Sequence, residues 1–423
     1  MAKTRLAVIF GSRSVEHEVS IITAQQIMAA ADREKYELVP IYITKQGEWL
    51  TGAALLDLET FREPGRLERL ERGYLVPAPG QRSLVRLEAG GLSLFRRGGG
   101  PEVDVVFPAV HGTHGEDGTL QGLLELADLP YVGAGVAGAA VGMDKILMKA
   151  AFQAAGLPVV DGRWYTRSAY QREPERVLDD VEAQIGYPAF VKPAVLGSSI
   201  GVARVDNRDD LRFALEVASA YGRRLLVERA LAPVIEVNCA VLGNDDPIAS
   251  VCEQPIPAEG VLSYADKYLS GAKGPNPPGS PPAGAKERIE AGGGDAHASP
   301  VTKQGQPGAN RRLIPAPISE ALTARIQALA VEAFRATDCA GIARVDFLVS
   351  PDQEHVYVNE INTMPGSLSF YLWEPSGVPF GELVDRLVAL ALERHEDRAR
   401  TNYSYETDLL LRTSVPGAGA KGS

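Results

Sequence analysis

Apolar positions follow two different periods along the N-terminal third of the chain. Residues 5–11 read RLAVIFG, a continuous apolar run typical of a buried strand, whereas residues 15–31 repeat apolar positions at helical spacing. The runs ELVPIYIT and VDVVFPAVHG predict further buried strands. Strands that alternate with helices predict a mostly parallel sheet whose functional loops follow the strand ends. We therefore expect residues 11–16 and 111–118 to lie at the ligand edge of this sheet.

The remaining pattern predicts two α+β units. PAFVKP and GVARV read as short strands before the helix DDLRFALEVASAYG. From residue 225 onward, LLVER, IEVNCAVLG, IASVCEQ, IARVDFLV and HVYVNEI read as strands. They are joined by an amphipathic helix whose apolar face consists of Leu322, Ile326, Leu329 and Ala333. Residues 52–100 have no clean period and predict a variable insertion with some helix and a hairpin.

These patterns divide the chain into three predicted domains. We expect an α/β domain with a Rossmann-like parallel sheet over residues 1–140, a small α+β unit over 141–222, and a larger one over 223–396. Residues 271–312 contain almost no large apolar side chain, which predicts an exposed, disordered insertion. Residues 397–423 predict a loose tail.

Composition narrows the class of protein. With 45% apolar and 23% charged residues, the 423-residue chain is ordinary for a globular protein, and its length favours several domains. A net charge of -11 without a basic stripe argues against a nucleic-acid partner. Three cysteines without CxxC spacing predict neither a disulfide framework nor a zinc site. No leader or membrane-spanning apolar run is visible, so we expect a cytoplasmic protein with no membrane partner.

Two predicted strands near the C-terminal end carry polar side chains at alternate positions. Arg344 and Asp346 are two residues apart on one strand, and Glu360 and Asn362 are two apart on the returning strand. Oxygen ligands of this kind suit Mg²⁺ held together with phosphate, and Arg344 would stabilise an anionic transition state. The alternative is an exposed hairpin face of charged residues. The otherwise apolar strands favour the metal site.

A lysine and a loop of small residues form a second candidate site. Lys192 directly precedes a loop that contains Gly197, Ser198, Ser199 and Gly201, whose backbone N–H groups could approach phosphate oxygens. A purely steric turn is the alternative for this loop. Neither GxxxxGK[ST] nor the HRD and DFG motifs occur in the chain, which excludes a Walker-type site and a protein kinase.

Two further motifs admit alternatives. Glu228 and Glu236 could bind adenosine, or they could be surface acids beside Arg229. GAGVAG at residues 133–138 matches a dinucleotide fingerprint, which would suit a dehydrogenase. It follows several strands instead of the first, so a linker into the next helix is the better interpretation. A non-catalytic nucleotide sensor is a third hypothesis, but it does not explain the acidic hairpin.

Eight motifs in order resemble one known family: GSRSVEHEVS, HGTHGEDGTLQG, MDK, VKPAVLGSSIGV, VERAL, ADKYLS, RVDF and NEINTMPGS. Over residues 4–395, the chain is similar to the D-alanine–D-alanine ligases of the ATP-grasp superfamily. The resemblance implies an ATP-grasp fold, a homodimer, and the joining of two D-alanines through a D-alanyl phosphate for peptidoglycan precursors. It also implies ATP and two Mg²⁺ or Mn²⁺ ions. A ligase that takes D-lactate or D-serine as second substrate is the alternative.

The resemblance also implies residue roles. Those near the amino acids are Glu16 for the first ammonium, Ser198 and Tyr268 hydrogen-bonded to it, and His111 in the pocket. The implied oxyanion donors are Arg344 and the Gly366 amide. The implied ATP contacts are Lys145, Lys192, Gly197, Ser198, Ser199, Glu228, Leu231, Glu236 and Lys267. The implied metal ligands are Asp346, Glu360 and Asn362.

The sequence departs from the family pattern in two places. Before Lys267, only Tyr264 of the usual aromatic pair is present. After NTMPG the chain is shorter than the common form, in which a serine binds the carboxylate of the second substrate. Either Ser367 or Ser369 could take that role, and the sequence does not decide between them.

Overall fold

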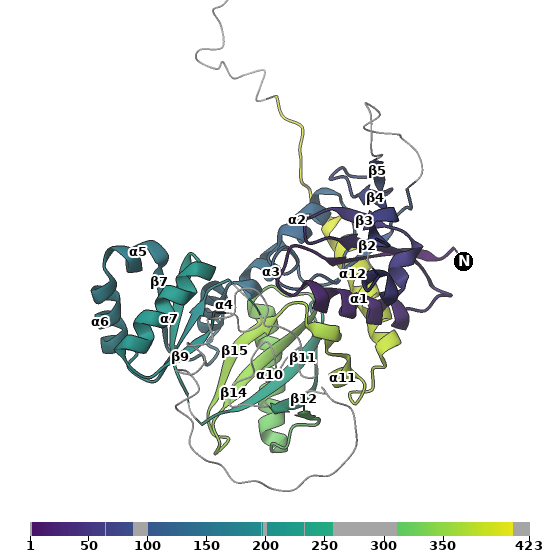
Figure 1. Ribbon diagram of the computed structural model, residues 1–423. Coiled ribbons are helices and arrows are strands. Elements are labelled where there is room, and N and C mark those ends of the chain that lie inside the picture. Colours follow the sequence, from purple (N-terminus) through teal and green to yellow (C-terminus); the bar gives the residue numbers. More distant parts are fainter. Residues whose placement is uncertain are drawn as a thin grey trace, which may run out of the picture.

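In the part of the chain that it describes, the computed structural model contains three β-sheets, each covered by helices (Figure 1). It describes residues 2–63, 65–87, 100–195, 197, 201–231, 233–256 and 311–408. Of the predicted insertion, only residues 311 and 312 lie within this part, and they belong to strand β13 (Arg311–Leu313). The predicted end of the insertion at residue 312 is therefore wrong, because backbone pairing with β12 incorporates these residues into a sheet.

The first sheet is mixed and not mostly parallel. Its strand order is β5-β4-β3-β2-β1-β6. The bounds are β1 Thr4–Gly11, β2 Tyr36–Ile43, β3 Trp49–Thr51, β4 Glu71–Tyr74, β5 Val85–Leu87 and β6 Val105–Pro108. Only β2, β1 and β6 run parallel. The connection from β2 to β3 spans residues 44–48, too short for the crossover that a parallel pair requires, so β3, β4 and β5 add as antiparallel strands. The predicted Rossmann-like sheet is correct for its parallel half only.

Helices from both ends of the chain cover the first sheet. The elements around it are α1 His17–Ala30, η1 Ala53–Leu56, η2 Leu58–Phe61, η3 Leu67–Arg69, α2 Thr119–Leu126 and α12 Phe380–Arg398. Leu383 and Leu387 of α12 share a buried cluster with Leu6 and Phe10 of β1. Figure 1 shows α12 beside α1, although they are far apart in sequence. Because α12 continues to Arg398, the predicted start of the tail at residue 397 is wrong.

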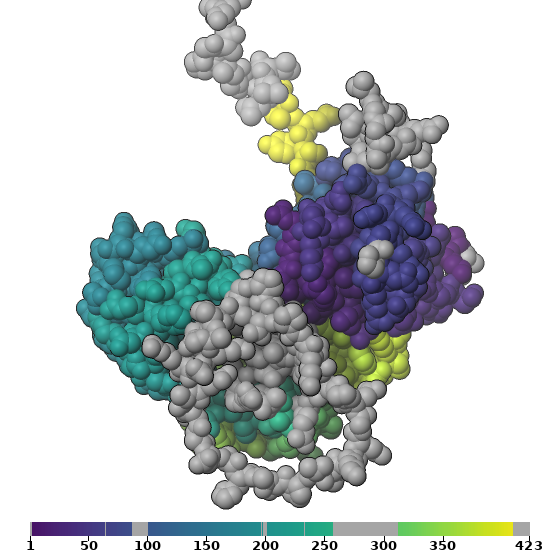
Figure 2. Space-filling model, in the orientation of Figure 1, coloured from purple at the N-terminus to yellow at the C-terminus, as the bar shows by residue number. Residues whose placement is uncertain are grey.

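The second sheet is antiparallel and has the order β7-β10-β8-β9. Its elements are β7 Gly162–Thr166, α5 Arg167–Arg172, α6 Pro174–Gln184, β8 Ala189–Pro193, β9 Ala203–Val205, α7 Arg208–Tyr221 and β10 Arg224–Arg229. Since β10 pairs with both β7 and β8, this unit extends to Arg229, and the predicted boundary between residues 222 and 223 is wrong. Figure 2 shows the unit as a teal lobe distinct from the purple N-terminal lobe.

The third sheet is antiparallel, with the order β13-β12-β11-β14-β15. Its elements are β11 Ile235–Gly243, β12 Ile248–Ile256, α10 Glu320–Ala336, β14 Gly341–Val349, β15 Val356–Asn362, η4 Gly366–Ser369 and α11 Phe370–Trp373. Helix α10 begins at the Ser319 cap and buries Leu322, Ile326 and Ala333 against one face of the sheet, as the apolar spacing predicts. Leu329 is only partly buried there. The opposite face carries polar side chains.

The glycine-rich segment before residue 140 connects the first sheet to the other two. Helix α3 (Val136–Met143) begins within this segment, directly after Gly135, and is followed by α4 (Lys145–Ala154). A Cβ at Gly138 would lie 2.3 Å from the carbonyl oxygen of Asp338, so close backbone packing requires this glycine. The linker interpretation of GAGVAG agrees with this geometry.

The three cysteines are buried and form no disulfide, as predicted. None of the helices within the described ranges combines the length and apolar character required to span a membrane.

Candidate functional site

A row of polar side chains crosses the open face of the third sheet. The strand register places Glu360 opposite Asp346, Asp346 opposite Asn238, and Asn238 opposite Glu253. Residues directly opposite one another point to the same face, so the row is continuous from β15 to β12. Asn238 and Glu253 are not among the residues that the sequence predicts. The available signal was a polar residue inside each of two otherwise apolar strands, IEVNCAVLG and IASVCEQ.

The hairpin has the geometry that its spacing predicts. Arg344 lies opposite Asn362, and its Nε and Nη2 donate to Asp346 at 2.6 and 2.8 Å. The Asn362 amide donates to the same carboxylate at 3.1 Å. The side chains of Arg344 and Asp346 are only 18% and 15% exposed, so the alternative of an exposed charged hairpin is wrong. Burial alone would lower the pKa of Arg344, but Asp346 raises it well above its usual value, and the guanidinium stays charged.

This hairpin offers a set of oxygen ligands that fits Mg²⁺. Among the described residues, no group of three or more His, Cys, Asp or Glu side chains is arranged to hold a metal ion. The predicted set has two carboxylates, Asp346 and Glu360, and the amide oxygen of Asn362. Magnesium ordinarily takes one or two carboxylates and completes its octahedron with water and phosphate oxygens. The ligand types therefore agree with a metal that also needs the nucleotide.

Two lysines share one buried carboxylate on the second sheet. Glu228 of β10 lies 2.7 Å from the ammonium of Lys192 on β8 and 2.6 Å from that of Lys149 on α4. Burial would raise the pKa of Glu228, but the two lysines lower it to about 2. Burial would likewise lower the pKa of Lys192, but Glu228 and the charge of Glu360 raise it. Glu228 and Lys192 are therefore both ionised at neutral pH.

The positions of Glu228, Lys192 and Lys149 exclude one alternative for Glu228 and add Lys149 to the site. Glu228 is 3% exposed, so it is not a surface acid beside Arg229. Its carboxylate holds Lys192 in place, and Glu236 and Leu231 line the same cavity. Lys149 is not among the predicted residues. Its position one helical turn after Lys145 was the available signal.

Three loops meet around Glu16, the residue before helix α1. The Glu16 side chain is buried, and a Cβ on Gly112 or Gly197 would lie 2.7 or 3.0 Å from its Oε2. Both backbones thus approach the carboxylate as closely as only glycine permits. The loops after β1 and β6 lie together at the predicted ligand edge, and the loop after Lys192 joins them there.

His111 and Glu116 fasten the loop after β15 to the N-terminal sheet. His111 Nδ1 donates to the Met364 carbonyl at 2.9 Å, and Nε2 accepts from the Thr23 hydroxyl at 2.9 Å. Glu116 accepts from the amides of Gly112 and Met364 at 2.7 and 3.0 Å. Burial lowers the pKa of His111. Burial and the charge of Glu16 raise the pKa of Glu116 to about 8. The histidine is therefore neutral and Glu116 largely protonated at neutral pH.

Glu116 is a further residue that the sequence does not single out. It lies within the predicted ligand edge at residues 111–118, but nothing in the motif HGEDG indicates which acid turns inward.

One cavity of about 650 Å³ joins these groups from all three sheets. The predicted residues that line it are Glu16, His111, Lys145, Lys192, Gly197, Glu228, Leu231, Glu236, Arg344, Asp346, Glu360, Asn362, Gly366 and Ser367. Ser369 is completely buried and does not line it. Other predicted residues lie outside the described part of the chain, namely Ser198, Ser199, Tyr264, Lys267 and Tyr268.

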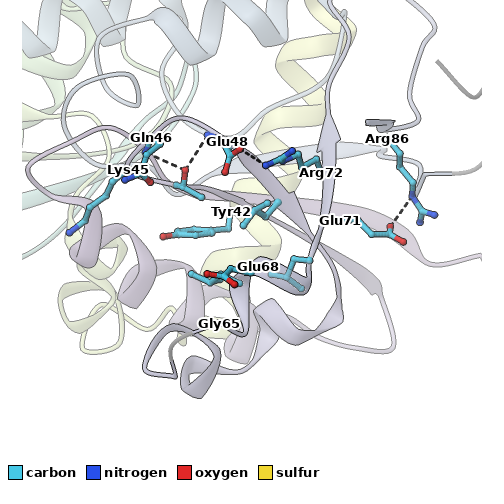
Figure 3. Close-up of a pocket in the computed structure, with 13 residues that line it drawn as sticks. Tyr42, Lys45, Gln46, Glu48, Gly65, Glu68, Glu71, Arg72 and Arg86 are labelled. Atoms are coloured by element: carbon cyan, nitrogen blue, oxygen red, sulfur yellow. Dashed lines mark hydrogen bonds and ion pairs between the residues drawn. The ribbon is translucent and has the colours of Figure 1, made fainter. Parts of the chain in front are cut away.

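A second cavity of about 820 Å³ lies on the antiparallel edge of the first sheet (Figure 3). Four of its charged residues form two ion pairs, with Arg72 2.6 Å from Glu48 and Arg86 2.9 Å from Glu71. None of the predicted site residues lines it. The 650 Å³ cavity is therefore the candidate active site, since it gathers cations, acids and glycine loops around one space.

Comparison with known proteins gives one consistent result. Residues 5–134 match the family model described as D-ala D-ala ligase N-terminus, and residues 151–287 and 302–389 match D-ala D-ala ligase C-terminus. The chain is 38% identical over 409 residues to a D-alanine–D-alanine ligase of Geobacillus thermodenitrificans, covering 96% of this chain and 100% of that protein. It is 40% identical over 404 residues to the ligase of Heliobacterium modesticaldum, covering 95% and 98%.

Solved structures agree. The D-alanine-D-alanine ligase from Coxiella burnetii is similar with a TM-score of 0.72 and 32% identity, over 95% of this chain and 97% of that one. The VanG D-Ala:D-Ser ligase from Enterococcus faecalis also has a TM-score of 0.72, with 27% identity, over 92% and 100%.

Proposed function

The chain belongs to the D-alanine–D-alanine ligase family, and we propose that it uses ATP to join two D-alanines through a D-alanyl phosphate. The observation that carries this proposal is the single cavity that Glu16, Lys192 and the Arg344–Asp346 pair all line. An amino-acid carboxylate held beside Glu16 would face a phosphate held by Lys192. No observation on the cavity favours D-serine or D-lactate over D-alanine as the second substrate.

We assign the contacts to the nucleotide to Lys145, Lys192, Leu231 and Glu236. Lys192 stays charged and is held by Glu228, so its ammonium can donate hydrogen bonds to phosphate oxygens without being reorganised. Gly197 supplies a backbone that can approach closely. Two Mg²⁺ or Mn²⁺ ions held by Asp346, Glu360 and Asn362 would neutralise phosphate charge during the transfer.

The donor D-alanine binds through its ammonium to Glu16. A carboxylate oxygen of this D-alanine attacks the γ-phosphorus of ATP and the bond between that phosphorus and ADP breaks, which gives the acyl-phosphate. The neutral amine of the second D-alanine then attacks the acyl carbon. Arg344 and the Gly366 amide stabilise the tetrahedral oxyanion, and phosphate leaves. Of the Arg344 nitrogens, Nε and Nη2 are committed to Asp346, so Nη1 is the donor assigned to the oxyanion.

The carboxylate of the second D-alanine requires a hydrogen-bond donor near Gly366. Ser367 lines the cavity, whereas Ser369 is completely buried. This supports Ser367 as the serine that contacts the second substrate. Its backbone amide donates to Thr23, which fixes the loop.

One assay tests the proposed function. Purified protein is given ATP, Mg²⁺ and D-alanine, with D-lactate and D-serine offered separately as acceptors, while phosphate release and product mass are recorded. D-alanyl-D-alanine with one phosphate released per dipeptide is the expected result. ATP hydrolysis without dipeptide, or a depsipeptide as main product, would refute the assignment. The homodimer expected from the resemblance is tested by sedimentation of the same preparation.

A further inference from the structure

Arg312 lines the 650 Å³ cavity and is not accounted for by the roles above. It is on β13, and its guanidinium carbon lies 3.9 Å from the ring centroid of Tyr371 on α11. The Tyr371 hydroxyl donates to Glu253 Oε1 at 3.2 Å. Asn238 donates to the same oxygen at 3.0 Å. Arg312 therefore lies beside Glu253, the last residue of the polar row that begins at the predicted metal ligand Glu360.

Among the residues that the structure describes, the contacts of Arg312 leave the donors of both its Nη atoms available. Stacking on Tyr371 uses the face of the guanidinium, whereas its N–H donors lie in the plane and point outward. Its Nε is 3.6 Å from Glu253 Oε2, an ion pair too long for a hydrogen bond. Within the described residues, neither Nη of Arg312 has a hydrogen-bond partner. The side chain is 33% exposed and lines the 650 Å³ cavity.

The second substrate carries a carboxylate, and the proposed reaction places this substrate beside Arg344. Tyr371, whose ring contacts Arg312, lies close enough to Arg344 for the two groups to interact electrostatically. Arg344 already uses two of its three nitrogens for Asp346. Ser367 can offer a neutral hydroxyl only, and a half-buried carboxylate needs a charged or multiple donor. Glu253 accepts hydrogen bonds from Asn238 and Tyr371 and forms an ion pair with Arg312 itself. Its negative charge therefore does not cancel the attraction between Arg312 and the substrate carboxylate.

We propose that Arg312 receives the carboxylate of the second substrate, and that Tyr371 and Glu253 position its guanidinium. This proposal rests on the proposed function, because it concerns the acceptor of the same reaction. Arg312 acts as a specificity determinant that selects an amino acid with a free carboxylate. Since it is anchored by a ring on one face and an acid at Nε, its two Nη groups present a preformed fork to the carboxylate.

A competition experiment tests this role. The full chain is given ATP, Mg²⁺, D-alanine and D-alaninamide, and the ratio of D-alanyl-D-alanine to D-alanyl-D-alaninamide is measured by mass spectrometry. The amide cannot serve as donor, so it reports on the acceptor site alone. Replacing a charge-assisted hydrogen bond should shift the ratio in Arg312→Gln roughly 10- to 100-fold toward the amide. The KM values for ATP and for donor D-alanine should stay within about twofold of wild type.

Two further variants distinguish recognition of the substrate carboxylate by Arg312 from a purely structural role of this residue. Arg335→Gln removes an exposed arginine of α10 that pairs with Glu332, and it should leave the product ratio unchanged. Arg312→Lys keeps a cation at the site and should keep the preference for D-alanine. A wild-type ratio in Arg312→Gln would overturn the proposal, as would an equal shift in Arg312→Lys. If wild-type protein made no dipeptide at all, the proposed function itself would fail, which is a different result.

Discussion

Replacing Glu228 by glutamine should destabilise the second sheet strongly, because it removes the carboxylate shared by two buried ammonium groups. The two ion pairs measure 2.6 and 2.7 Å, and the side chains of Lys149 and Lys192 are 9% and 15% exposed. Breaking a buried pair by removing one partner costs about 3–5 kcal/mol. The pKa of Glu228, lowered from 4.5 to about 2, corresponds to about 3 kcal/mol, in agreement.

Urea unfolding at pH 7, followed by circular dichroism, measures this difference between wild type and Glu228→Gln. Because the folded-state pKa is depressed, the contribution is present above pH 4.5 and is lost as the pH falls toward 2. The difference in the free energy of unfolding between wild type and Glu228→Gln should therefore decrease as the pH falls from 4.5 toward 2. Glu332→Gln, at an exposed pair, serves as the control and should change stability by less than about 0.5 kcal/mol. A loss below about 1 kcal/mol in Glu228→Gln would refute the reasoning.

Three further changes test the site. Asp346→Asn should lower Mg²⁺-dependent phosphate release about 100-fold or more, because it removes a charged ligand of the predicted metal; near-normal turnover would exclude this ligand. His111→Phe leaves the Met364 carbonyl unpaired and should cost about 1–3 kcal/mol in a thermal melt, while an unchanged melting temperature would contradict the buried hydrogen bond. Ser367→Ala should raise the KM for the second D-alanine roughly 2- to 10-fold, whereas Ser369→Ala should not; the opposite order would reverse our choice of serine.

Local patterns predicted many of the helices and strands and the polar face of the C-terminal hairpin. The alternation of RVDF and NEIN places Arg344, Asp346, Glu360 and Asn362 on one face of a hairpin, because side chains in a strand repeat every two residues. The buried run before Gly11 and the helix after it are visible in the same way. These features depend on neighbours within a few residues, and the order of eight motifs is enough to recognise the family.

Contacts between distant segments could not be read from the sequence. The pairing of β10 with β7 and β8 moves the end of the second unit to Arg229, and short hairpin connections make half of the first sheet antiparallel. Likewise, α12 completes the core of the N-terminal sheet although it comes last in the chain. Strand order and helix docking depend on which apolar surfaces fit together after collapse, and no local period records that.

In the candidate site, too, the sequence predicted residue types, whereas the fold determined the partners of each side chain. Residue types indicated a lysine for phosphate, acids for a metal and an arginine for an oxyanion. Only packing determined that Glu228 would be shared by Lys149 and Lys192, that Ser369 would be buried while Ser367 lines the cavity, and that Arg312 would stack on Tyr371. A side chain's chemistry belongs to its own atoms, but its partners and its exposure to solvent depend on segments that approach it only when the chain has folded.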